Sequence, residues 1–173
     1  MKNKLTRLLK YDLPLHFVIL LTNWLPDMVI ILRLRGWLAK PFFGKCGKNL
    51  RLGRNVIFYN PQNIAIGNDV YVAYGNWFSA GEKIELDDEV MIGPYCVFAS
   101  SNHTRKNGSF RYGKPEKSPV FVGKGCWIAA QCTILAGSKI ECGSLLAANS
   151  VASGTLAKDM LFAGSPARKV RTL

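Results

Sequence analysis

Small or slim side chains and bulky apolar side chains recur together every six residues along the C-terminal half of the chain. The first residue of each hexad is Val120, Cys126, Cys132, Ser138, Ser144, Ser150 or Leu156, and two places later stands Val122, Ile128, Ile134, Ile140, Leu146 or Ala152. This period belongs neither to an α-helix nor to a simple alternating strand. It fits a coil of three short flat faces, in which each face stacks on the one about eighteen residues earlier. The pattern therefore predicts an all-β protein, built as a parallel β-helix.

The same period extends upstream with one small break and one long one. The upstream hexads begin at Ile64, Val70 and Asn76, and after two extra residues near 81–83 they resume at Ile84, Val90, Cys96 and Asn102. Residues 103–119 leave the period, and they are polar and basic. We expect them to project from the β-helix as a long arm loop. Loops on rigid scaffolds commonly carry functional residues, so the arm is the first place to look for a site.

Residues 1–44 differ in character from the repeats. We expect them to form a basic, apolar helical segment, followed by the β-helix over 45–156 and by a turn with a basic tail over 157–173. The apolar run over 13–32 is interrupted by Pro14, His16, Asn23, Pro26 and Asp27. A membrane-spanning helix and a cleavable signal peptide are both disfavoured by these interruptions. Two short helices separated at 23–27 are predicted instead.

Two interpretations of this segment stay open. In the first, the helices lie in or dip into an anionic membrane surface, with Trp24 and Trp37 at the headgroups. In that position, the lipid phosphates would be contacted by three cations, Arg33, Arg35 and Lys40. In the second, residues 13–38 only cap the open first coil of the β-helix, because end coils need covering. One segment could serve both purposes.

Charge and cysteine content narrow the partners and the compartment. Of the net charge of +12, residues 1–54 carry +9, because eleven Lys or Arg there are set against Asp12 and Asp27. The apolar residues between these charges favour a membrane over nucleic acid, for which no recognition helix or base-stacking platform is readable. Five cysteines form no C-x-x-C pair, and three of them take inward hexad positions. We expect free thiols in a reducing, cytosolic compartment.

The candidate chemistry centres on one of two histidines. His16 lies in the apolar N-terminal segment, whereas His103 stands where the repeats stop and the arm begins, beside Asn102. Imidazole is the side chain best suited to general-base catalysis near neutral pH. Two distant histidines cannot supply a three-histidine zinc site, and no metal site is expected. A G-x-S-x-G elbow and a phosphate-binding loop are also missing from the sequence.

Four features together resemble the hexapeptide-repeat acyltransferases. They are the hexads, S-N-H-T at 101–104 opening a long arm, V-G-K-G-C-W-I-A-A at 122–130, and A-G-S-P-A-R at 163–168. Within that family the chain is most similar to the galactoside and maltose O-acetyltransferase branch. The segments N-W-L-P-D at 23–27 and R-G-W-L at 35–38 are similar to those of sugar O-acetyltransferases of bacterial capsule and O-antigen clusters.

The resemblance implies a left-handed β-helix that assembles as a homotrimer and uses acetyl-CoA as acyl donor. His103 matches the family's catalytic base, and Asn102 matches a neighbour of that base and would orient the acceptor. The coenzyme would lie between adjacent β-helices, against the backbone of Ala130 and Ala148. Its contacts would be completed by Trp127, near the pantetheine arm, and by Arg168 and Lys169, near the phosphates; Trp127 is equally explained as an outward packing residue.

The expected function is O-acetylation of a sugar hydroxyl on a cell-surface glycan or its lipid-linked precursor. The enzyme would be cytoplasmic and peripheral on the inner face of the cell membrane. One rival is an acetyltransferase of a small soluble acceptor such as an antibiotic, which shares the fold and the histidine. Another is a non-catalytic β-helical scaffold, which has no need of His103, the arm and a basic C-terminal turn together. The acceptor sugar, its hydroxyl and the length of the acyl group are not readable from the sequence.

Overall fold

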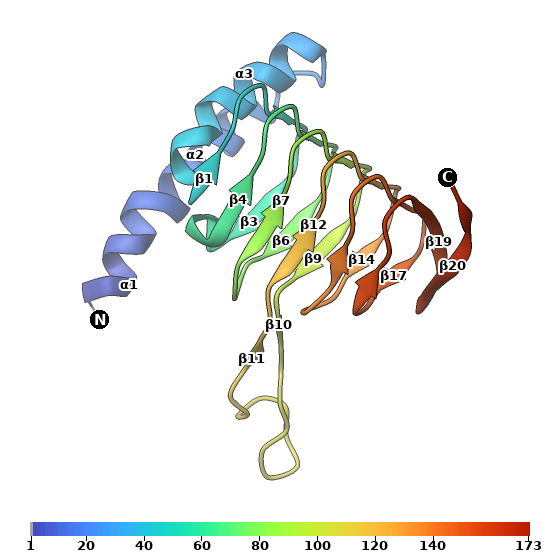
Figure 1. The fold of residues 1–173 in the computed structure, drawn as a ribbon. Coiled ribbons are helices and arrows are strands. Elements are labelled where there is room, and N and C mark those ends of the chain that lie inside the picture. The colour runs from blue at the N-terminus through green and yellow to red at the C-terminus, as the bar shows by residue number, and fades with distance from the viewer. Residues whose placement is uncertain (1) are drawn as a thin grey trace.

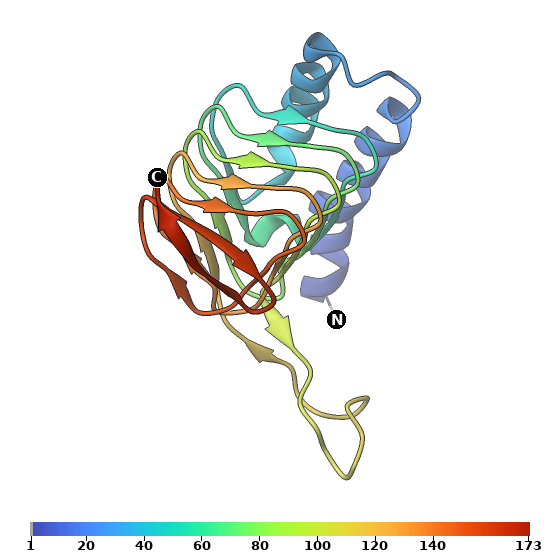
Figure 2. The same ribbon diagram turned by 90° about the vertical axis from the view of Figure 1, so that its right-hand side faces the viewer.

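The chain folds into a three-sided prism of stacked coils, with helices at one end and a long arm leaving one corner (Figures 1 and 2). This computed structural model describes residues 2–173, with side chains from Leu5 onward. The three faces of the prism are sheets whose strands pair in parallel from coil to coil. The predicted left-handed parallel β-helix, with its N-terminal helical segment and its arm, is thereby confirmed.

Each sheet takes one strand from nearly every coil. Sheet A contains β1 (Lys45–Cys46), β4 (Ile64–Ile66), β7 (Ile84–Leu86), β12 (Val120–Val122), β15 (Lys139–Ile140) and β18 (Thr155–Leu156). Sheet B contains β2 (Arg51–Leu52), β5 (Tyr71–Val72), β8 (Met91–Ile92), β13 (Trp127–Ile128), β16 (Leu145–Leu146), β19 (Met160–Gly164) and β20 (Ala167–Thr172). Sheet C contains β3 (Ile57–Tyr59), β6 (Trp77–Ser79), β9 (Val97–Ala99), β14 (Thr133–Ile134) and β17 (Val151–Ala152).

The length of a coil changes along the prism. In sheet A the register places Lys45 beside Ala65 and Ala65 beside Glu85, so the first two coils take twenty residues each. The coil with the arm runs from Glu85 to Phe121, and the next runs the regular eighteen residues to Lys139. The extra residues lie at the corner between sheets C and A, where the short 3₁₀ helix η3 (Pro61–Asn63) stands in the first coil. The sheets therefore stay in register although the corners vary.

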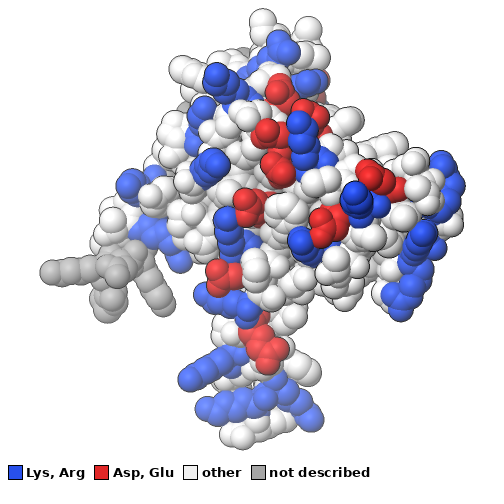
Figure 3. Space-filling view, viewed as in Figure 1, with Lys and Arg blue, Asp and Glu red and all other residues white. Residues whose placement is uncertain are grey.

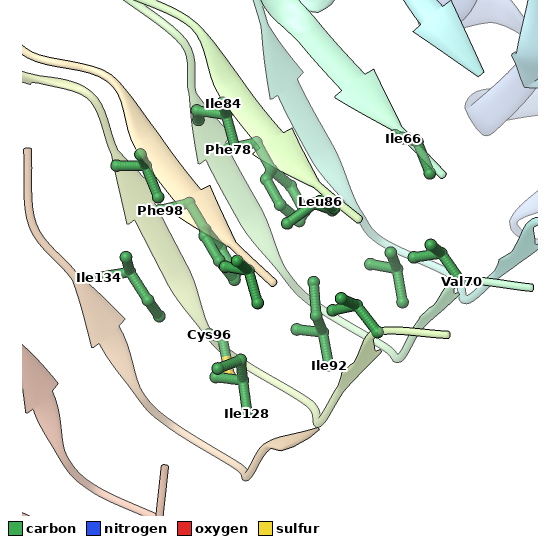
Figure 4. Packing of buried hydrophobic residues seen from close by; sticks show 14 of the residues in the cluster. Ile66, Val70, Phe78, Ile84, Leu86, Ile92, Cys96, Phe98, Ile128 and Ile134 are labelled. Atoms are coloured by element: carbon green, nitrogen blue, oxygen red, sulfur yellow. The ribbon is translucent and has the colours of Figure 1, made fainter. Parts of the chain in front are cut away.

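The interior confirms the hexad prediction. Both marked positions of the hexads are buried along the prism except at Asn102, which is exposed; the prediction was wrong there, because the buried Ser100 takes the inward place. Figure 4 shows part of this core, in which Phe78 stacks on Phe98 with ring centroids 4.7 Å apart. The buried polar residues of the core are satisfied: the amide of Asn76, for example, donates to the carbonyls of Ala73 and Gly93 and accepts from the N–H of Cys96. Such pairing offsets the cost of burying polar groups.

Helices close the N-terminal end of the prism. They are α1 (Lys2–Arg7), the π-helix η1 (Leu8–Asp12), α2 (Leu13–Thr22), α3 (Val29–Ala39) and the 3₁₀ helix η2 (Lys40–Phe42). The break between α2 and α3 falls in the predicted region 23–27. Leu15, Ile19 and Ala39 are buried in one cluster with the first coils, so the helices cover the open end. Among residues 2–173, no helix combines the length and the apolar character needed to cross a bilayer.

Arg35 was expected to face lipid phosphates, and that expectation was wrong. It is fully buried between α3, the end of α2 and the first coil. Its guanidinium donates to the Thr22 hydroxyl (3.1 Å), the Asp27 carboxylate (3.1 Å) and the Leu52 carbonyl (2.6 Å). Burial lowers the pKa of Arg35, and the charge of Asp27 partly offsets this. The guanidinium points inward because the chain supplies an anion and carbonyl acceptors there, as a buried charge requires.

The other charged and aromatic side chains that were expected to contact the membrane lie on the surface. Trp24, Arg33, Trp37 and Lys40 are exposed. Asn23 and Asp27 also reach the first coil, because the backbone N–H of Asn55 donates to the Asn23 side chain (3.0 Å). These polar interruptions of the apolar run therefore attach the helices to the prism.

The C-terminal segment 157–173 is more ordered than a turn with a tail. Strand β19 adds to sheet B in parallel beside β16, and β20 folds back antiparallel on β19. The hairpin turn is the A-G-S-P-A-R motif. The hairpin therefore closes the C-terminal end of sheet B and places Arg168 and Lys169 on a paired strand.

Candidate active site

His103 lies at the base of the arm, at the corner between sheets C and A. The chain leaves β9, passes the buried Ser100 and forms the short antiparallel pair β10 (Ser101–Asn102) with β11 (Glu116–Lys117) before entering β12. We call residues 100–103 and 116–119 the arm corner. The Ser100 hydroxyl fixes its base, since it donates to the carbonyl of Glu82 (2.7 Å) and accepts from the N–H of the same residue (2.9 Å).

The side chains of His103 and Asn102 are exposed. Within residues 2–173 the imidazole has no hydrogen bond or ion pair. A general base is normally oriented by a second group. Among the described residues, no side chain holds the His103 ring in place by a hydrogen bond. Asn102 is its neighbour in the sequence.

Beyond His103 the arm is a hairpin whose conformation is fixed by hydrogen bonds and glycine residues. The Thr104 hydroxyl donates to the Lys114 carbonyl (2.5 Å), and Lys106 and Ser109 exchange two backbone hydrogen bonds around Asn107 and Gly108. Both of these turn residues have positive φ, which Asn and Gly tolerate. A Cβ at Gly113 would collide with the Thr104 carbonyl oxygen, so the two strands of the arm approach closely only because this residue is glycine. The arm is thus a defined element that fixes where its base points.

The opposite corner, between sheets B and C, repeats one turn in successive coils. Pro94, Ala130 and Ala148 occupy equivalent positions, each followed by a residue with positive φ. The turns interlock, since the N–H of Gln131 donates to the Pro94 carbonyl and the N–H of Asn149 donates to the Ala130 carbonyl. We call the positions of Pro94, Ala130 and Ala148 the alanine corner.

The alanine corner presents unused donors. The N–H groups of Ala130 and Ala148 find no acceptor in the part of the chain that the structure describes, and Ala148 is exposed. Two successive coils therefore carry free backbone donors at equivalent positions of one corner. Amide carbonyls of an extended ligand are natural acceptors for such a column.

The other predicted coenzyme residues lie beside this corner. Arg168 pairs with Ala163, one place before Gly164, which continues the column of Ala130 and Ala148 in the last coil. Arg168 and Lys169 are both exposed. Trp127 is half-exposed on the outer side of sheet B, in register between Met91 and Leu145. The structure thus gathers Ala130, Ala148 and Arg168 at one corner and places Trp127 on the adjoining face.

His103 is not brought to that corner within one chain. The arm corner and the alanine corner lie at opposite edges of sheet C, because β9 and β14 each run from the alanine corner toward the other edge. One copy of the chain therefore holds a candidate base at one edge and candidate coenzyme contacts at the other.

The outer surfaces of the prism differ in a way that the sequence analysis missed. The signal is the residue directly after each inward hexad position, which points outward. In sheet C these residues are Ile57, Trp77, Val97, Thr133 and Val151, and in sheet B they include Tyr71, Met91, Trp127, Leu145 and Leu161. Sheet A instead carries ion pairs, such as Lys83 with Glu85 (2.6 Å), and Figure 3 shows mixed charges across this face. The outer faces of sheets B and C are thus mainly apolar, although Arg51 and the basic strand β20 lie on sheet B, and the outer face of sheet A is charged.

No metal centre emerges from the described residues, in which no group of three His, Cys, Asp or Glu side chains is close enough to hold an ion. The cysteines of the core do not suggest one either. Burial raises the pKa of the Cys126 thiol to about 11, and its Sγ donates to the Glu141 carbonyl (3.0 Å). Such a thiol packs as a small apolar residue and is a poor nucleophile.

Comparison with known proteins agrees with the motifs. Galactoside O-acetyltransferase of Escherichia coli K12 is 26% identical over 137 residues, which cover 79% of this chain and 61% of that protein. WbbJ of the same strain, provisionally named a lipopolysaccharide biosynthesis O-acetyl transferase, is 28% identical over 72% of this chain and 66% of its own. The chain is therefore similar in sequence to named O-acetyltransferases. No protein-family model matches it.

A solved structure extends the agreement to the fold. A hexapeptide-repeat acetyltransferase from Vibrio cholerae, crystallised with acetyl coenzyme A, superimposes with a TM-score of 0.79 at 24% identity, covering 94% of this chain and 86% of that one. The chain spans less than two thirds of the length of the two E. coli relatives. The names of these relatives describe their own reactions. The activity of this chain must therefore be argued from its own residues.

Proposed function

We propose that this protein is an acetyl-CoA-dependent O-acetyltransferase that modifies a sugar hydroxyl of a cell-surface glycan or of its lipid-linked precursor. The observation that carries the proposal is the pairing of two elements on one scaffold. One is an exposed histidine at the base of a shaped arm, and the other is a column of unpartnered backbone donors with Arg168 beside it. The first suits proton removal and the second suits an extended amide- and phosphate-bearing donor.

The donor fits the alanine corner. The pantetheine arm of acetyl-CoA carries amide carbonyls, which could accept from the N–H groups of Ala130 and Ala148. Its phosphates are anions that Arg168 and Lys169 could bind. Trp127 would border the same path on sheet B. When bound, acetyl-CoA supplies the acetyl group as a thioester.

His103 would act as general base. Its unprotonated ring nitrogen takes the proton of the acceptor hydroxyl as the oxygen attacks the thioester carbonyl carbon. The carbon–sulfur bond then breaks, coenzyme A leaves as the thiolate, and the proton held by His103 returns to the sulfur. Asn102 would orient the acceptor, and backbone N–H groups are the natural donors to the oxyanion that develops. The transfer is direct and needs no covalent enzyme intermediate.

A homotrimer would complete the site. Closed cyclic assembly through unlike surfaces buries two different faces of every copy, and this prism has two apolar faces, on sheets B and C, and a charged third. If sheet C of one copy lies against sheet B of the next, the arm of one protomer meets the alanine corner of its neighbour. The proposal therefore gives each site residues from two protomers.

The helical segment supports a location at the inner face of the cell membrane, with the protein in the cytoplasm. Trp24, Ile30 and Trp37 are 78%, 71% and 67% exposed, more than Trp77 (45%) and Trp127 (50%) on the faces of the prism. Cations such as Arg33 and Lys40 share this surface. Exposed apolar side chains among cations are typical of helices that bind anionic lipid. The buried side of the same helices caps the prism, so the two interpretations of this segment are compatible.

The first test is coenzyme A release from acetyl-CoA by wild type and by His103→Asn. Membrane extract carrying lipid-linked glycans is added in one arm and small soluble acceptors, antibiotics among them, in the other. Loss of a general base lowers turnover by about 100- to 10,000-fold, whereas acetyl-CoA binding measured by calorimetry should not change. A variant as active as wild type removes His103 as the base. Turnover with soluble acceptors alone favours the drug-modifying rival.

The membrane part of the proposal is tested by flotation. We expect wild type to float with phosphatidylglycerol vesicles and a Trp24→Ser, Ile30→Ser, Trp37→Ser variant to remain at the bottom, because the exposed apolar contacts are lost. All three side chains are exposed, so the fold should persist; retained thermal stability is the control. Equal flotation of the two proteins contradicts the membrane assignment without affecting the catalytic one.

A further inference from the structure

A groove of about 750 Å³ separates the helical segment from the first strand of sheet C. We call it the α2 groove. Its walls are the π-helix η1 and α2 on one side and β3 on the other, and it is lined by Leu8, Leu13, Ile19, Leu20, Ile57 and Tyr59 among others. Its size falls within the range of protein sites for small molecules. Neither the proposed base nor the proposed coenzyme contacts belong to it.

Two polar groups of the groove are paired within the protein, whereas the His16 side chain, which also lines it, is exposed and has no hydrogen bond or ion pair among the described residues. Asp12 accepts from the backbone N–H of Asn60 (3.3 Å) and pairs with Arg7 (3.3 Å). Leu8 and Leu20, by contrast, are 45% and 55% exposed. A mainly apolar channel favours an apolar ligand, because a polar ligand would find few free partners besides His16.

The groove lies on the same edge of sheet C as the arm corner. Strands β3, β6 and β9 are neighbours, and their register places Tyr59 beside Ser79 and Ser79 beside Ala99. Two strand spacings, or roughly 10 Å, therefore separate the end of the groove from the residues that lead into His103. A ligand in the groove would have its polar end within reach of the proposed base.

The groove is also continuous with the surface proposed to contact the membrane. Leu20 lines the groove, and its neighbour Leu21 is 67% exposed on α2. Adjacent residues of α2 therefore belong to the groove and to the exposed apolar surface. The basic excess of the N-terminal segment suits an anionic group at the end of a bound hydrocarbon chain.

We propose that the α2 groove binds the hydrocarbon tail of a lipid-linked glycan acceptor and so presents its sugar to His103. This inference rests on the proposed function, because it assumes that the acceptor carries a lipid. The acceptor is favoured over an ordinary membrane phospholipid by the shared edge with the arm corner. The groove selects lipid-linked sugar over free sugar, and it raises the local concentration of the acceptor at the base.

The chain offers a matched pair of variants. Leu8→Gln with Leu20→Gln alters two residues that line the groove, whereas Leu9→Gln with Leu21→Gln alters their neighbours on the same two helices, which do not line it. All four side chains are at least 45% exposed. The pairs have the same composition and charge, and both reduce the apolar surface available to a membrane. Only the first pair changes the groove.

The binding experiment uses farnesyl diphosphate with a photoreactive diazirine on its tail, and mass spectrometry maps the labelled peptides. We expect labelling within residues 8–20 and 57–60. It should fall at least tenfold in the groove pair and less than twofold in the neighbour pair. The proposal is overturned if the two pairs are labelled equally or if labelling falls elsewhere. It is also overturned if dihexanoyl phosphatidylglycerol competes as strongly as unlabelled farnesyl diphosphate. Cross-linking of the groove to a second copy overturns it too.

A kinetic experiment separates this inference from the proposed function. Turnover is measured with the glycan extract before and after mild acid has removed the lipid. We expect wild type and the neighbour pair to prefer the lipid-linked form at least tenfold in kcat/KM and the groove pair to lose that preference while retaining turnover of the free glycan. If wild type transfers acetyl to the lipid-linked and the free glycan without preference, the inference about the α2 groove is wrong and the proposed function stands. Transfer to neither form sinks the proposed function, and photolabelling still decides whether the groove binds the tail.

Discussion

The two corners that border sheet C differ in regularity, although the same strands connect them. The alanine corner repeats one tight turn in every coil, and its carbonyls and N–H groups interlock from coil to coil. At the arm corner the spacing between coils varies, and there the arm leaves the prism between β9 and β12. One corner is regular enough to line up backbone donors, and the other is free to carry an insertion.

This difference shows how a repeat fold can hold a site without losing its core. Insertion at the arm corner leaves the inward residues of β9 and β12 buried, because the strands on either side keep their register. Repetition at the alanine corner creates a line of identical donors that no single loop could provide. The width of sheet C keeps the two apart within one copy, and this separation gives the comparison its strongest test.

Mixed assemblies test whether the two corners act across protomers, and they should show the largest effect. His103→Asn damages the arm corner, and Arg168→Glu with Lys169→Glu damages the alanine corner. Each protein alone should have at most about one hundredth of wild-type kcat/KM, through loss of the base or of charge-assisted phosphate contacts. After joint refolding, about one site in four combines two intact corners in a random trimer. Coenzyme A release should then recover to about a quarter of the wild-type rate.

The control for this experiment is a mixture of the two proteins assembled separately, which should stay inactive. Joint assembly without recovery would place both corners of each site in the same chain, contrary to the proposed trimer. A monomeric mass by light scattering would contradict it as well.

Closing the space at Gly113 tests how precisely the arm must be held. Gly113→Ala introduces a methyl group where the Thr104 carbonyl lies, so the strands of the arm must separate. A displacement of about 1 Å near reacting groups can lower turnover by about 100-fold; we expect a 10- to 100-fold loss of kcat with an unchanged melting temperature, since the arm lies outside the core. Gly108→Asn is the matched control, because Asn tolerates the positive φ at that turn. If both variants retain full activity, the shape of the arm is unimportant.

Removing one donor from the alanine corner should have the smallest effect. Ala148→Pro deletes the N–H while suiting a turn that already contains proline at the equivalent position of Pro94. Loss of one hydrogen bond of about 1.4 kcal/mol corresponds to a tenfold rise in the KM for acetyl-CoA. Ala148→Ser keeps the N–H and should behave as wild type. A KM that rises equally in both variants would assign the effect to the side chain and not to the backbone donor.

Much of the architecture followed from the sequence because a hexad constrains every strand. A residue of each hexad that points inward must fill a narrow prism, so the period alone assigns Cys126, Ser138 and Ile128 to the core. The arm was readable because it interrupts the period, and His103 because it stands at the interruption. The similarity to known acetyltransferases then followed from motifs at the same positions.

Other features were decided only by tertiary structure. Arg35 lies among cations that could face lipid, and its burial depends on Asp27, Thr22 and a carbonyl of the first coil meeting at one point. The α2 groove exists because two helices lie beside β3, which no local pattern specifies. The distance between His103 and the alanine corner likewise follows from the width of a sheet. Periodicity fixes which way a side chain points, but what it meets there depends on packing between segments far apart in the chain.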